Sequence, residues 1–301
     1  MLNLDPSIVK NVLLTGATGF LGSKLTARLL DCPATYCVTA LKRSRSNTWR
    51  IDHLAGLRTV DVDEYSLADL FASSRFDIII HCATDYGSNS IDQSDIVETN
   101  LLLPVRLLDL GIRHGLSIFI NTDTMLDKRV SSYTLSKRQF REWLESVADR
   151  IVGINVVLEH FYGAGDNRSK FVTGVIRDLL TKVPNIPLTL GEQKRDFIYI
   201  DDVVEAFFCI LERVISAPPS CQEYQVGTGN SVTLREFIST AHELCGSPCT
   251  ILDFGAVAYR PNEPMDVRVD LERLHALGWR SRWSLREGLG ATIDLERRML
   301  K

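Results

Sequence analysis

The amino-acid sequence predicts an α/β fold, with a doubly wound parallel sheet and a smaller, interleaved C-terminal lobe. Strand and helix signals alternate over the first 158 residues, which implies right-handed crossovers between parallel strands. The predicted strand Phe76–His81 is apolar on both faces, as expected for a strand buried inside a parallel sheet. A glycine-rich loop, Gly16–Gly22, joins the first predicted strand to the first predicted helix.

The predicted elements of the first half follow one another at short intervals. Strands are expected at residues 12–15, 36–41, 57–62, 76–81, 116–120 and 153–158, and helices at 21–30, 91–114 and 132–147. After Glu159 the pattern is less regular, with a loop expected over Lys182–Pro187 and a helix over Leu234–Cys245. We therefore expect a first domain at residues 1–158, joined by late elements from about 196–228, and a second lobe at 159–301.

Composition narrows the class of protein. The chain has 301 residues, of which 45% are hydrophobic and 24% charged, and its net charge is −4. This balance is ordinary for a soluble globular protein and does not indicate a nucleic-acid partner. The N-terminal segment does not resemble a signal peptide, and no apolar run approaches the roughly 18 residues that a membrane span needs. We expect a cytoplasmic protein without a membrane partner.

The cysteines indicate neither disulfides nor a metal site. There are seven, and this odd number is scattered along the chain, unlike a disulfide framework. Cys245 and Cys249 have no second pair of ligands after them. We therefore expect free thiols and no bound metal.

Gly16, Gly19 and Gly22 have the spacing of a dinucleotide-binding loop. The first glycine permits a tight turn, the second lets the backbone approach a pyrophosphate, and the third lets the helix pack against the strand. The backbone N–H groups and the dipole at the start of the helix would hold the anion. The strand–loop–helix context therefore predicts a Rossmann-type nicotinamide cofactor site.

The end of the second predicted strand bears on the type of cofactor. NAD sites usually carry a carboxylate there, which accepts hydrogen bonds from the adenosine ribose. This chain instead has Lys42, Arg43, Ser44 and Arg45. Cations and a hydroxyl suit a 2′-phosphate, so we expect NADP(H), with NAD(H) as the alternative.

Tyr133 and Lys137 are four residues apart on a predicted helix and therefore share one face. The nearby ammonium is expected to lower the pKa of the phenol towards the range useful for proton transfer. The spacing is common on its own. Together with the glycine loop it indicates a hydride-transfer site.

Three elements together resemble the extended short-chain dehydrogenase/reductases: the glycine loop, the Tyr133/Lys137 pair, and Thr122 at a strand end. The resemblance covers essentially the whole chain. It implies that Thr122 hydrogen-bonds the substrate oxygen, that Tyr133 exchanges a proton with it, and that Lys137 binds the nicotinamide ribose; these three are the expected catalytic residues. It also implies a set of cofactor-binding residues: Gly16, Thr18, Gly19, Phe20, Leu21, Gly22, Lys42, Arg43, Ser44, Asp61, Val62, Cys82, Ala83, Thr84, Asn100, Tyr133, Lys137 and His160.

The C-terminal half resembles the nucleotide-sugar branch of this family. The segments that carry the resemblance include Lys170–Phe171, Arg195–Asp202 and Arg260–Glu263. They imply that Arg195 and Arg260 bind the diphosphate of a nucleoside-diphosphate sugar and that Glu263 binds its ribose, since a guanidinium matches phosphate oxygens. The expected substrate-binding residues are Asp85, Tyr86, Asp123, Thr124, Lys170, Phe171, Arg195, Arg260 and Glu263.

Two further expectations come from this branch. Many of its members form homodimers through the helix that carries the Tyr/Lys pair and its long neighbour, so we expect a homodimer. Asp201 and Asp202 are expected to be structural and to cap the helix that follows them, rather than to act as paired catalytic carboxylates.

Within the branch, five stretches resemble 4-ketoreductases of the CDP-abequose and CDP-paratose synthase type: Ala83–Gly87, Phe119–Asp123, Leu158–Gly163, Gly191–Phe197 and Glu223–Gly229. The resemblance implies NADPH-dependent reduction of a 4-keto-6-deoxyhexose or 3,6-dideoxyhexose linked to CDP or dTDP, in deoxysugar biosynthesis for surface polysaccharide. The alternatives are an NAD-dependent 4-epimerase and a non-catalytic cofactor-binding regulator. A 4,6-dehydratase is disfavoured, because Thr124 stands where that enzyme has a glutamate after Asp123.

Overall fold

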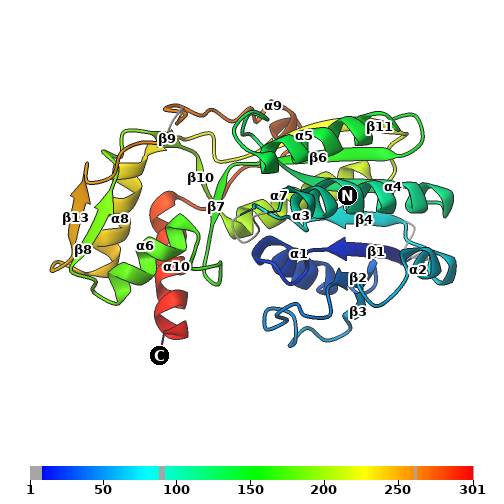
Figure 1. Ribbon diagram of the computed structural model, residues 1–301, viewed down its shortest axis with the longest axis horizontal. Helices are drawn as coiled ribbons and strands as arrows, with labels where there is room; N and C mark the ends of the chain where they lie inside the picture. Colours follow the sequence, from blue (N-terminus) through cyan, green and yellow to red (C-terminus); the bar gives the residue numbers. More distant parts are fainter. Residues whose placement is uncertain (1–8, 88–91, 261–262, 301) are drawn as a thin grey trace. The chain divides into compact units, whose positions relative to one another are not determined.

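The computed structural model of the protein describes residues 9–87, 92–260 and 263–300 (Figure 1). The chain divides into two compact units. Unit 1 comprises Met1–Val157 and Ile210–Tyr224, and unit 2 comprises Leu158–Cys209 and Gln225–Lys301. None of the helices in the described ranges is long and apolar enough to cross a membrane.

Unit 1 is built on a seven-stranded sheet with the strand order β11-β6-β5-β4-β1-β2-β3. The strands are β1 (Lys10–Thr15), β2 (Tyr36–Lys42), β3 (Arg58–Asp61), β4 (Ile78–His81), β5 (Ile118–Thr124), β6 (Val152–Leu158) and β11 (Ser220–Val226). β2 runs parallel to β1 and β3, and β4 runs parallel to β1 and β5. The strand order reverses between β1 and β4, which places a crevice at the carboxyl ends of these two strands. The predicted doubly wound sheet is confirmed.

One hydrophobic core of unit 1 joins the sheet to its helices. The helices are α1 (Phe20–Leu30), α2 (Leu67–Ser73), α3 (Gln93–Val97), the π-helical segment η1 (Glu98–Leu102), α4 (Leu103–Arg113) and α5 (Ser132–Glu145); α7 (Ile200–Val214) runs across the division at Ile210. Leu13, Ile79 and Phe119 are register partners in adjacent strands and belong to one buried cluster with Leu107 of α4 and Phe140 of α5. Because side chains alternate along a strand, α4 and α5 cover the same face of the sheet.

The prediction of one continuous helix over residues 91–114 is wrong, because the helix is not regular. Residue 91 lies outside the described residues, and the segment from Gln93 to Arg113 is α-helical, then π-helical, then α-helical. Pro104 lies just after the start of α4. It lacks an N–H, and its ring would clash with the carbonyl of Asn100 in a regular α-helix, so the turn widens.

Unit 2 consists of helices and two-stranded sheets. Its helices are α6 (Phe171–Leu180), α8 (Leu234–Cys245), α9 (Glu272–Ala276), α10 (Leu285–Met299) and the first part of α7, and its strands are β7 (His160–Tyr162), β8 (Asn185–Leu188), β9 (Lys194–Arg195), β10 (Phe197–Tyr199), β12 (Val232–Thr233) and β13 (Ile251–Phe254). β10 pairs with β7, β12 with β9, and β13 with β8. The rings of Phe197 and Phe237 stack at 3.8 Å, and Tyr162 meets Phe237 edge-on at 5.5 Å. These aromatic contacts join the β10–β7 pair to α8.

The loop predicted over Lys182–Pro187 is wrong in part. Asn185–Leu188 forms β8, which pairs in parallel with β13. Pro187 is the residue that suggested a loop, because proline cannot donate a hydrogen bond to a partner strand. In a two-stranded sheet one side of each strand is unpaired, so a proline is tolerated there.

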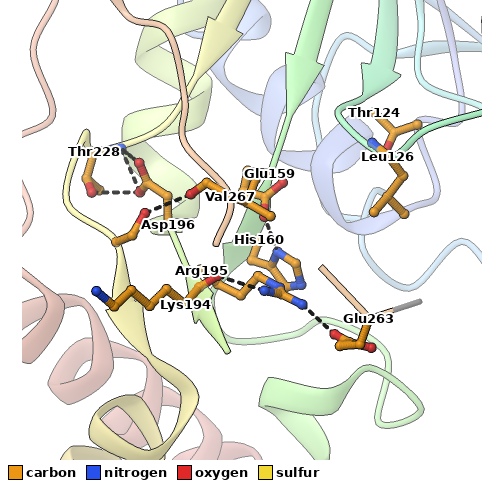
Figure 2. A network of polar contacts seen from close by, with 11 residues as sticks. Thr124, Leu126, Glu159, His160, Lys194, Arg195, Asp196, Thr228, Glu263 and Val267 are labelled. Carbon is orange, nitrogen blue, oxygen red and sulfur yellow. Dashed lines mark hydrogen bonds and ion pairs between the residues drawn. The ribbon is translucent and has the colours of Figure 1, made fainter. Parts of the chain in front are cut away.

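A buried carboxylate holds together the strands and turns of unit 2. Asp196 is 0% exposed and accepts hydrogen bonds from the backbone N–H groups of Thr228 and Gly229, at 2.9 and 2.8 Å, and from Thr228 Oγ1 at 2.6 Å (Figure 2). Asp196 is the buried partner in these bonds, and a buried carboxylate needs such donors. Asp196 therefore joins the β9–β10 segment to the turn after β11.

We predict that Asp196→Ala lowers the free energy of unfolding by about 3 kcal/mol, because the substitution removes the hydrogen bonds that a charged, buried carboxylate accepts from two backbone N–H groups and a hydroxyl. Urea unfolding followed by circular dichroism measures this change. Glu192→Ala is the matched control, since Glu192 is exposed on the same segment, and it should change stability by no more than about 0.5 kcal/mol. Equal effects of the two substitutions would contradict the prediction.

Candidate active site

The glycine-rich loop forms a cradle at the carboxyl end of β1. Gly16 has a φ of +74°, in the left-handed region that favours glycine. A Cβ on Gly16 would lie 2.6 Å from the backbone nitrogen of Ala83, and a Cβ on Gly22 would overlap the carbonyl oxygen of Gly16. Gly19 is the exposed N-cap residue of α1, whose first backbone N–H groups have no acceptor inside the helix. This shape fits the pyrophosphate of a dinucleotide.

Two predicted residues of the loop, Phe20 and Leu21, have buried side chains, and a further residue near the loop, Arg50, was not predicted. The side chains of Phe20 and Leu21 are buried, so only their backbone would contact a cofactor. Arg50, from the connection between β2 and β3, donates a hydrogen bond from Nη1 to the carbonyl oxygen of Thr18 at 3.1 Å. Arg50 therefore braces the loop. No motif marks it in the sequence.

The basic turn after β2 lies beside the end of β3. Lys42 forms an ion pair with Asp61, its register partner on β3. Ser44 donates from its backbone N–H and from Oγ to the two oxygens of Asp63, both at 2.8 Å. Arg43 is exposed. Two of the three residues expected at a 2′-phosphate thus already bind carboxylates, which the sequence pattern of the turn did not indicate.

The segment after β4 is tied to both neighbouring strands. Thr15 Oγ1 lies 2.8 Å from His81 Nδ1 and accepts a hydrogen bond from the backbone N–H of Ala83 at 3.2 Å. Thr122 Oγ1 donates to the carbonyl oxygen of His81 at 3.0 Å. Burial raises the pKa of the Cys82 thiol to about 12, so this group stays protonated. The segment Cys82–Thr84, which is predicted to bind the cofactor, is therefore held in place through its backbone.

Asn100 on η1 holds the backbone of Asp85. Its Oδ1 accepts from Asp85 N–H at 2.8 Å, and its Nδ2 donates to the Asp85 carbonyl at 2.8 Å and to Ser136 Oγ at 3.0 Å. Both amide hydrogens are used in these bonds. The structure thus shows Asn100 joining the segment after β4 to α5, and its cofactor-binding role stays a prediction.

Helix α5 presents the predicted catalytic pair. It begins at a capping box in which Ser131 Oγ accepts from Thr134 N–H at 3.2 Å and Thr134 Oγ1 accepts from Ser131 N–H at 3.1 Å. The ring of Tyr133 lies 4.9 Å from that of Tyr86, between ring centres. Lys137 is 2% exposed, and its Nζ has no hydrogen-bond partner among the residues that the structure describes. Such an orphaned donor fits the ribose hydroxyls of a nicotinamide cofactor.

The expectation that Lys137 lowers the pKa of Tyr133 is wrong for the described chain. Burial raises the pKa of Tyr133 well above its usual value, Tyr86 and Asp123 raise it further, and only a hydrogen bond with Thr124 lowers it. Burial likewise lowers the pKa of Lys137, against the opposing charge of Asp123. Desolvation outweighs the attraction between neighbouring groups at this site.

Arg141, which no motif indicated, links two charged residues next to the pair. Asp123 accepts from its neighbour Thr124 N–H at 2.7 Å and from Arg141 Nε at 2.6 Å, and Arg141 also donates from Nη1 to Glu223 on β11 at 2.6 Å. Arg141 lies two helical turns after Tyr133 on the same face of α5. That spacing is the one signal that could have identified it.

In unit 2, Arg195 is buried at 6% exposure and forms an ion pair with Glu263 (Figure 2). Its Nη1 also donates to the Lys194 carbonyl at 2.7 Å. The backbone N–H of Glu263 donates to the carbonyl of Arg260, whose side chain is exposed. The structure thus brings together Arg195 and Glu263, two of the three residues expected at the nucleoside diphosphate.

The other predicted residues of unit 2 lie on β7 and at the start of α6. His160 Nδ1 lies 2.8 Å from a carboxylate oxygen of Glu159 (Figure 2). Lys170 is the N-cap residue of α6, and burial lowers its pKa against the charge of Asp166. Phe171 is 45% exposed. These positions leave their predicted roles open to test.

Asp202 is structural, but it does not cap a helix as predicted. Its carboxylate accepts from the backbone N–H groups of Arg282, at 3.0 Å, and Trp283, at 3.0 Å. It therefore ties the start of α7 to the segment before α10. Burial raises its pKa. Asp201 is exposed in the first turn of α7.

Within unit 1 the predicted residues lie on the loops and strand ends at the carboxyl side of β1 to β5, in the first turn of α1, and on η1 and α5. They are Gly16, Thr18, Gly19, Phe20, Leu21, Gly22, Lys42, Arg43, Ser44, Asp61, Val62, Cys82, Ala83, Thr84, Asp85, Tyr86, Asn100, Thr122, Asp123, Thr124, Tyr133 and Lys137. Among the described residues there is no cluster of three or more His, Cys, Asp or Glu side chains that could hold a metal ion.

Comparisons with known proteins agree with this arrangement. Residues 12–227 match the model of the NAD dependent epimerase/dehydratase family. The chain is 34% identical over 289 residues to CDP-abequose synthase of Salmonella typhimurium, covering 92% of this chain and 95% of that protein. It is also 34% identical over 298 residues to CDP-abequose synthase of Salmonella muenchen, covering 95% and 98%. The predicted resemblance to the nucleotide-sugar branch is confirmed.

Solved structures share the fold at lower sequence identity. UDP-glucose 4-epimerase of Thermotoga maritima superposes with a TM-score of 0.83 and 20% identity, covering 97% of this chain and 100% of that one. UDP-glucuronic acid 4-epimerase of Bacillus cereus superposes with a TM-score of 0.81 and 22% identity, covering 96% and 99%. At these identities the comparison concerns the fold alone.

We predict that Gly16→Ala weakens the binding of NADPH and NADH at least about tenfold, because alanine is strained at a φ of +74° and its Cβ would displace the backbone of Ala83. Titration of the reduced cofactor's fluorescence measures the dissociation constant. Gly290→Ala in α10 is the matched control, since an added Cβ there meets no atom within 4 Å. Unchanged affinity in Gly16→Ala would show that the loop does not cradle the cofactor.

Proposed function

The chain belongs to the NAD-dependent epimerase/dehydratase family, and we propose that it reduces the 4-keto group of a nucleoside-diphosphate 4-keto-6-deoxyhexose or 3,6-dideoxyhexose, with NADPH as the reductant. The observation that carries this proposal is the geometry of the site in unit 1: the glycine loop fits a dinucleotide, and α5 places the half-buried phenol of Tyr133 one turn before Lys137, whose buried Nζ has no partner among the described residues. Ketoreduction needs a proton donor at the carbonyl oxygen. The 34% identity to CDP-abequose synthases supports the substrate class.

The catalytic roles follow from the positions of three side chains. When bound, the reduced nicotinamide supplies the hydride that the carbonyl carbon accepts. Tyr133 donates its proton to the carbonyl oxygen. Thr122 turns its hydroxyl hydrogen from the His81 carbonyl, 3.0 Å away, to the same substrate oxygen. Lys137 binds the ribose of the cofactor through its orphaned Nζ.

The surroundings of Asp123 argue against water elimination. A dehydratase needs one group to donate a proton and another to remove one. Here the carboxylate of Asp123 is bound by Arg141 and by the backbone of Thr124, and a threonine follows it in place of a glutamate. The chain therefore lacks the acid–base pair, while the ketoreductase residues are all present.

The nucleotide is proposed to be cytidine diphosphate, with dTDP as the second candidate. Arg195 in unit 2 is buried beside Glu263 and presents the planar fork that suits a diphosphate. Arg195 and Arg260 are proposed to bind the diphosphate, and Glu263 is proposed to bind the ribose of the nucleotide. The choice of CDP rests on the named relatives, the CDP-abequose synthases.

The preference for NADPH is proposed from the turn after β2. Arg43 and Arg45 are exposed there, and no carboxylate ends β2. Lys42 and Ser44 bind Asp61 and Asp63. The exposed arginines are therefore the proposed ligands of the 2′-phosphate.

A homodimer is proposed through an exposed apolar face of unit 1. Leu102 of η1 and Trp143 of α5 are 40% and 54% exposed. A hollow of about 370 Å³ on this face is lined by Leu101, Gln139, Glu142, Trp143 and Ser146. Large exposed apolar groups around a hollow are typical of a protein–protein interface. The partner is proposed to be a second copy of the chain, placed helix against helix.

The function is tested by incubating the purified protein with CDP- and dTDP-linked 4-keto-6-deoxy and 4-keto-3,6-dideoxy sugars, each with NADPH or NADH. We expect oxidation of NADPH that depends on the CDP sugar, and NMR of the product then gives the configuration at C4. Stoichiometric NAD in the purified protein, with interconversion of sugars and no net oxidation of NADPH, would instead identify a 4-epimerase. A higher kcat/KM with NADH than with NADPH would overturn the proposed cofactor preference.

We predict that Tyr133→Phe lowers kcat at least about a hundredfold, since it removes the proton donor while keeping the ring. The dissociation constant of NADPH should stay within about twofold of the wild type, which fluorescence titration checks. Tyr65→Phe, at a tyrosine 47% exposed in unit 1, is the control and should keep full activity. Substantial residual turnover in Tyr133→Phe would refute the assignment.

We predict that Trp143→Glu halves the molar mass measured by size-exclusion chromatography with light scattering, because a charge placed in an apolar interface opposes association. Trp49→Glu is the matched control, since Trp49 is similarly exposed, at 47%, but lies outside that face. A wild-type protein that is already monomeric, or a dimer that survives Trp143→Glu, would contradict the proposed interface.

A further inference from the structure

Helix α5 carries two cations one turn apart, and both are largely withdrawn from solvent. Lys137 is 2% exposed, and the side chain of Arg141 is 14% exposed. Like charges at this spacing on a helix repel each other. Burial removes the water that would otherwise screen them. Two such groups persist only if a carboxylate nearby compensates their charge.

Asp123 at the end of β5 is that carboxylate, and both of its oxygens are engaged by other groups. Its side chain is 1% exposed. Oδ2 accepts from Arg141 Nε at 2.6 Å, and Oδ1 accepts from the backbone N–H of Thr124 at 2.7 Å. Arg141 is itself held from the far side, by Glu223 at 2.6 Å. The carboxylate is therefore bound to the arginine and not to the lysine.

Lys137 is the group left without a bond. Its Nζ has no hydrogen-bond partner within the described part of the chain. The charge of Asp123 nevertheless acts on it, since Asp123 opposes the lowering of the Lys137 pKa by burial. A free buried ammonium beside a carboxylate would ordinarily pair with it, because an unpaired buried charge is costly. Arg141 Nε on Oδ2 and the Thr124 N–H on Oδ1 compete with Lys137 for this carboxylate.

We propose that Arg141 is a positioning residue, which binds Asp123 and thereby keeps the ammonium of Lys137 available to the ribose hydroxyls of the nicotinamide cofactor. The proposal rests on the cofactor-binding role of Lys137 in the proposed function. It explains why Tyr133, Lys137 and Arg141 recur at four-residue intervals on one face of α5. Tyr133 and Lys137 act on the bound ligands, and Arg141 keeps the competing carboxylate of Asp123 away from Lys137.

The charged and titratable groups around this arrangement fix the sign of the expected change. Lys137 faces Asp123 on β5, Tyr133 and Arg141 on α5, and the neighbouring groups His81, at the end of β4, and Cys82, just after it. Arg141 faces Asp123, Glu223 on β11 and Glu145 on α5. Without Arg141, Asp123 is released to pair with Lys137, and one cation is lost from the site. Both changes favour the protonated amine, so Lys137 would keep its proton to higher pH.

The test uses Arg141→Met and needs no sugar substrate. We expect NADPH to bind at least about tenfold more weakly, measured by cofactor fluorescence. We also expect the titration midpoint of Lys137 to rise by about one pH unit. That midpoint is followed in protein labelled with ε-¹³C-lysine, where the Lys137 signal is assigned by its loss in Lys137→Arg. Neither readout requires turnover, so a failure of the ketoreductase assignment would leave this test intact.

The double variant separates positioning from a merely structural role. If Arg141 acts through Asp123, then Asp123→Asn/Arg141→Met should bind NADPH within about twofold of Asp123→Asn alone, because no anion is left to capture Lys137. A tenfold loss that persists in the double variant would overturn the proposal. So would a Lys137 midpoint that is unchanged or lower in Arg141→Met.

Two further variants control for the loss of the network itself. Glu223→Gln breaks the other ion pair of Arg141, at the same distance of 2.6 Å, without releasing Asp123. It should leave the NADPH affinity and the Lys137 midpoint unchanged, and an effect equal to that of Arg141→Met would overturn the proposal. Arg141→Lys keeps a cation near Asp123 and should bind NADPH within about threefold of the wild type. Should Arg141→Met not fold, as judged by circular dichroism, Arg141→Gln replaces it in both comparisons.

Discussion

The burial of the Lys137 ammonium, which has no hydrogen-bond partner in residues 9–87, 92–260 and 263–300, is the constraint on which the site of unit 1 depends. Lys137 can occupy such a place only if the surrounding structure fixes it there, because a solvated position would be more favourable for the isolated group. Helix α5 supplies this rigidity. It begins at the Ser131 capping box, and Phe140, one turn after Ser136, packs into the core against Phe119. The packing of α5 thus holds the ammonium of Lys137 in a fixed position where a ligand can bind it.

His81, a buried neighbour of Lys137, adds no positive charge beside it. His81 is fully buried on β4, and burial together with the charge of Lys137 holds its pKa well below the usual value. The ring is therefore neutral, and Thr15 Oγ1 lies 2.8 Å from its Nδ1. The carbonyl of His81 accepts from Thr122. His81 thus connects β4 to Thr15 of β1 and to Thr122 of β5. It also fixes the position of the hydroxyl of Thr122, the predicted catalytic threonine.

The fold and the shared face of Tyr133 and Lys137 could be predicted from the sequence because both depend on local spacing. The glycines of the first loop and the Tyr133/Lys137 interval are fixed by the geometry of a turn and a helix, so they remain readable without three-dimensional information. The widened turn at η1 and the strand β8 escaped, since Pro104 just after η1 and Pro187 within β8 have effects that depend on their partners. The Asp123–Arg141–Glu223 chain escaped as well, because it joins residues up to 100 positions apart. Contacts of that kind are set by topology, which no spacing encodes.

The electrostatics around Tyr133 bear on the direction of the proposed reaction. A ketoreductase needs a phenol that holds its proton until the carbonyl oxygen takes it, whereas an epimerase must first remove a proton from a hydroxyl. Burial, Tyr86 and Asp123 raise the pKa of Tyr133. Asp123 also favours the charged form of Lys137. A single carboxylate, held in place by Arg141, thus favours the protonated state of both residues. In the proposed reduction, both residues begin the reaction in these protonated states.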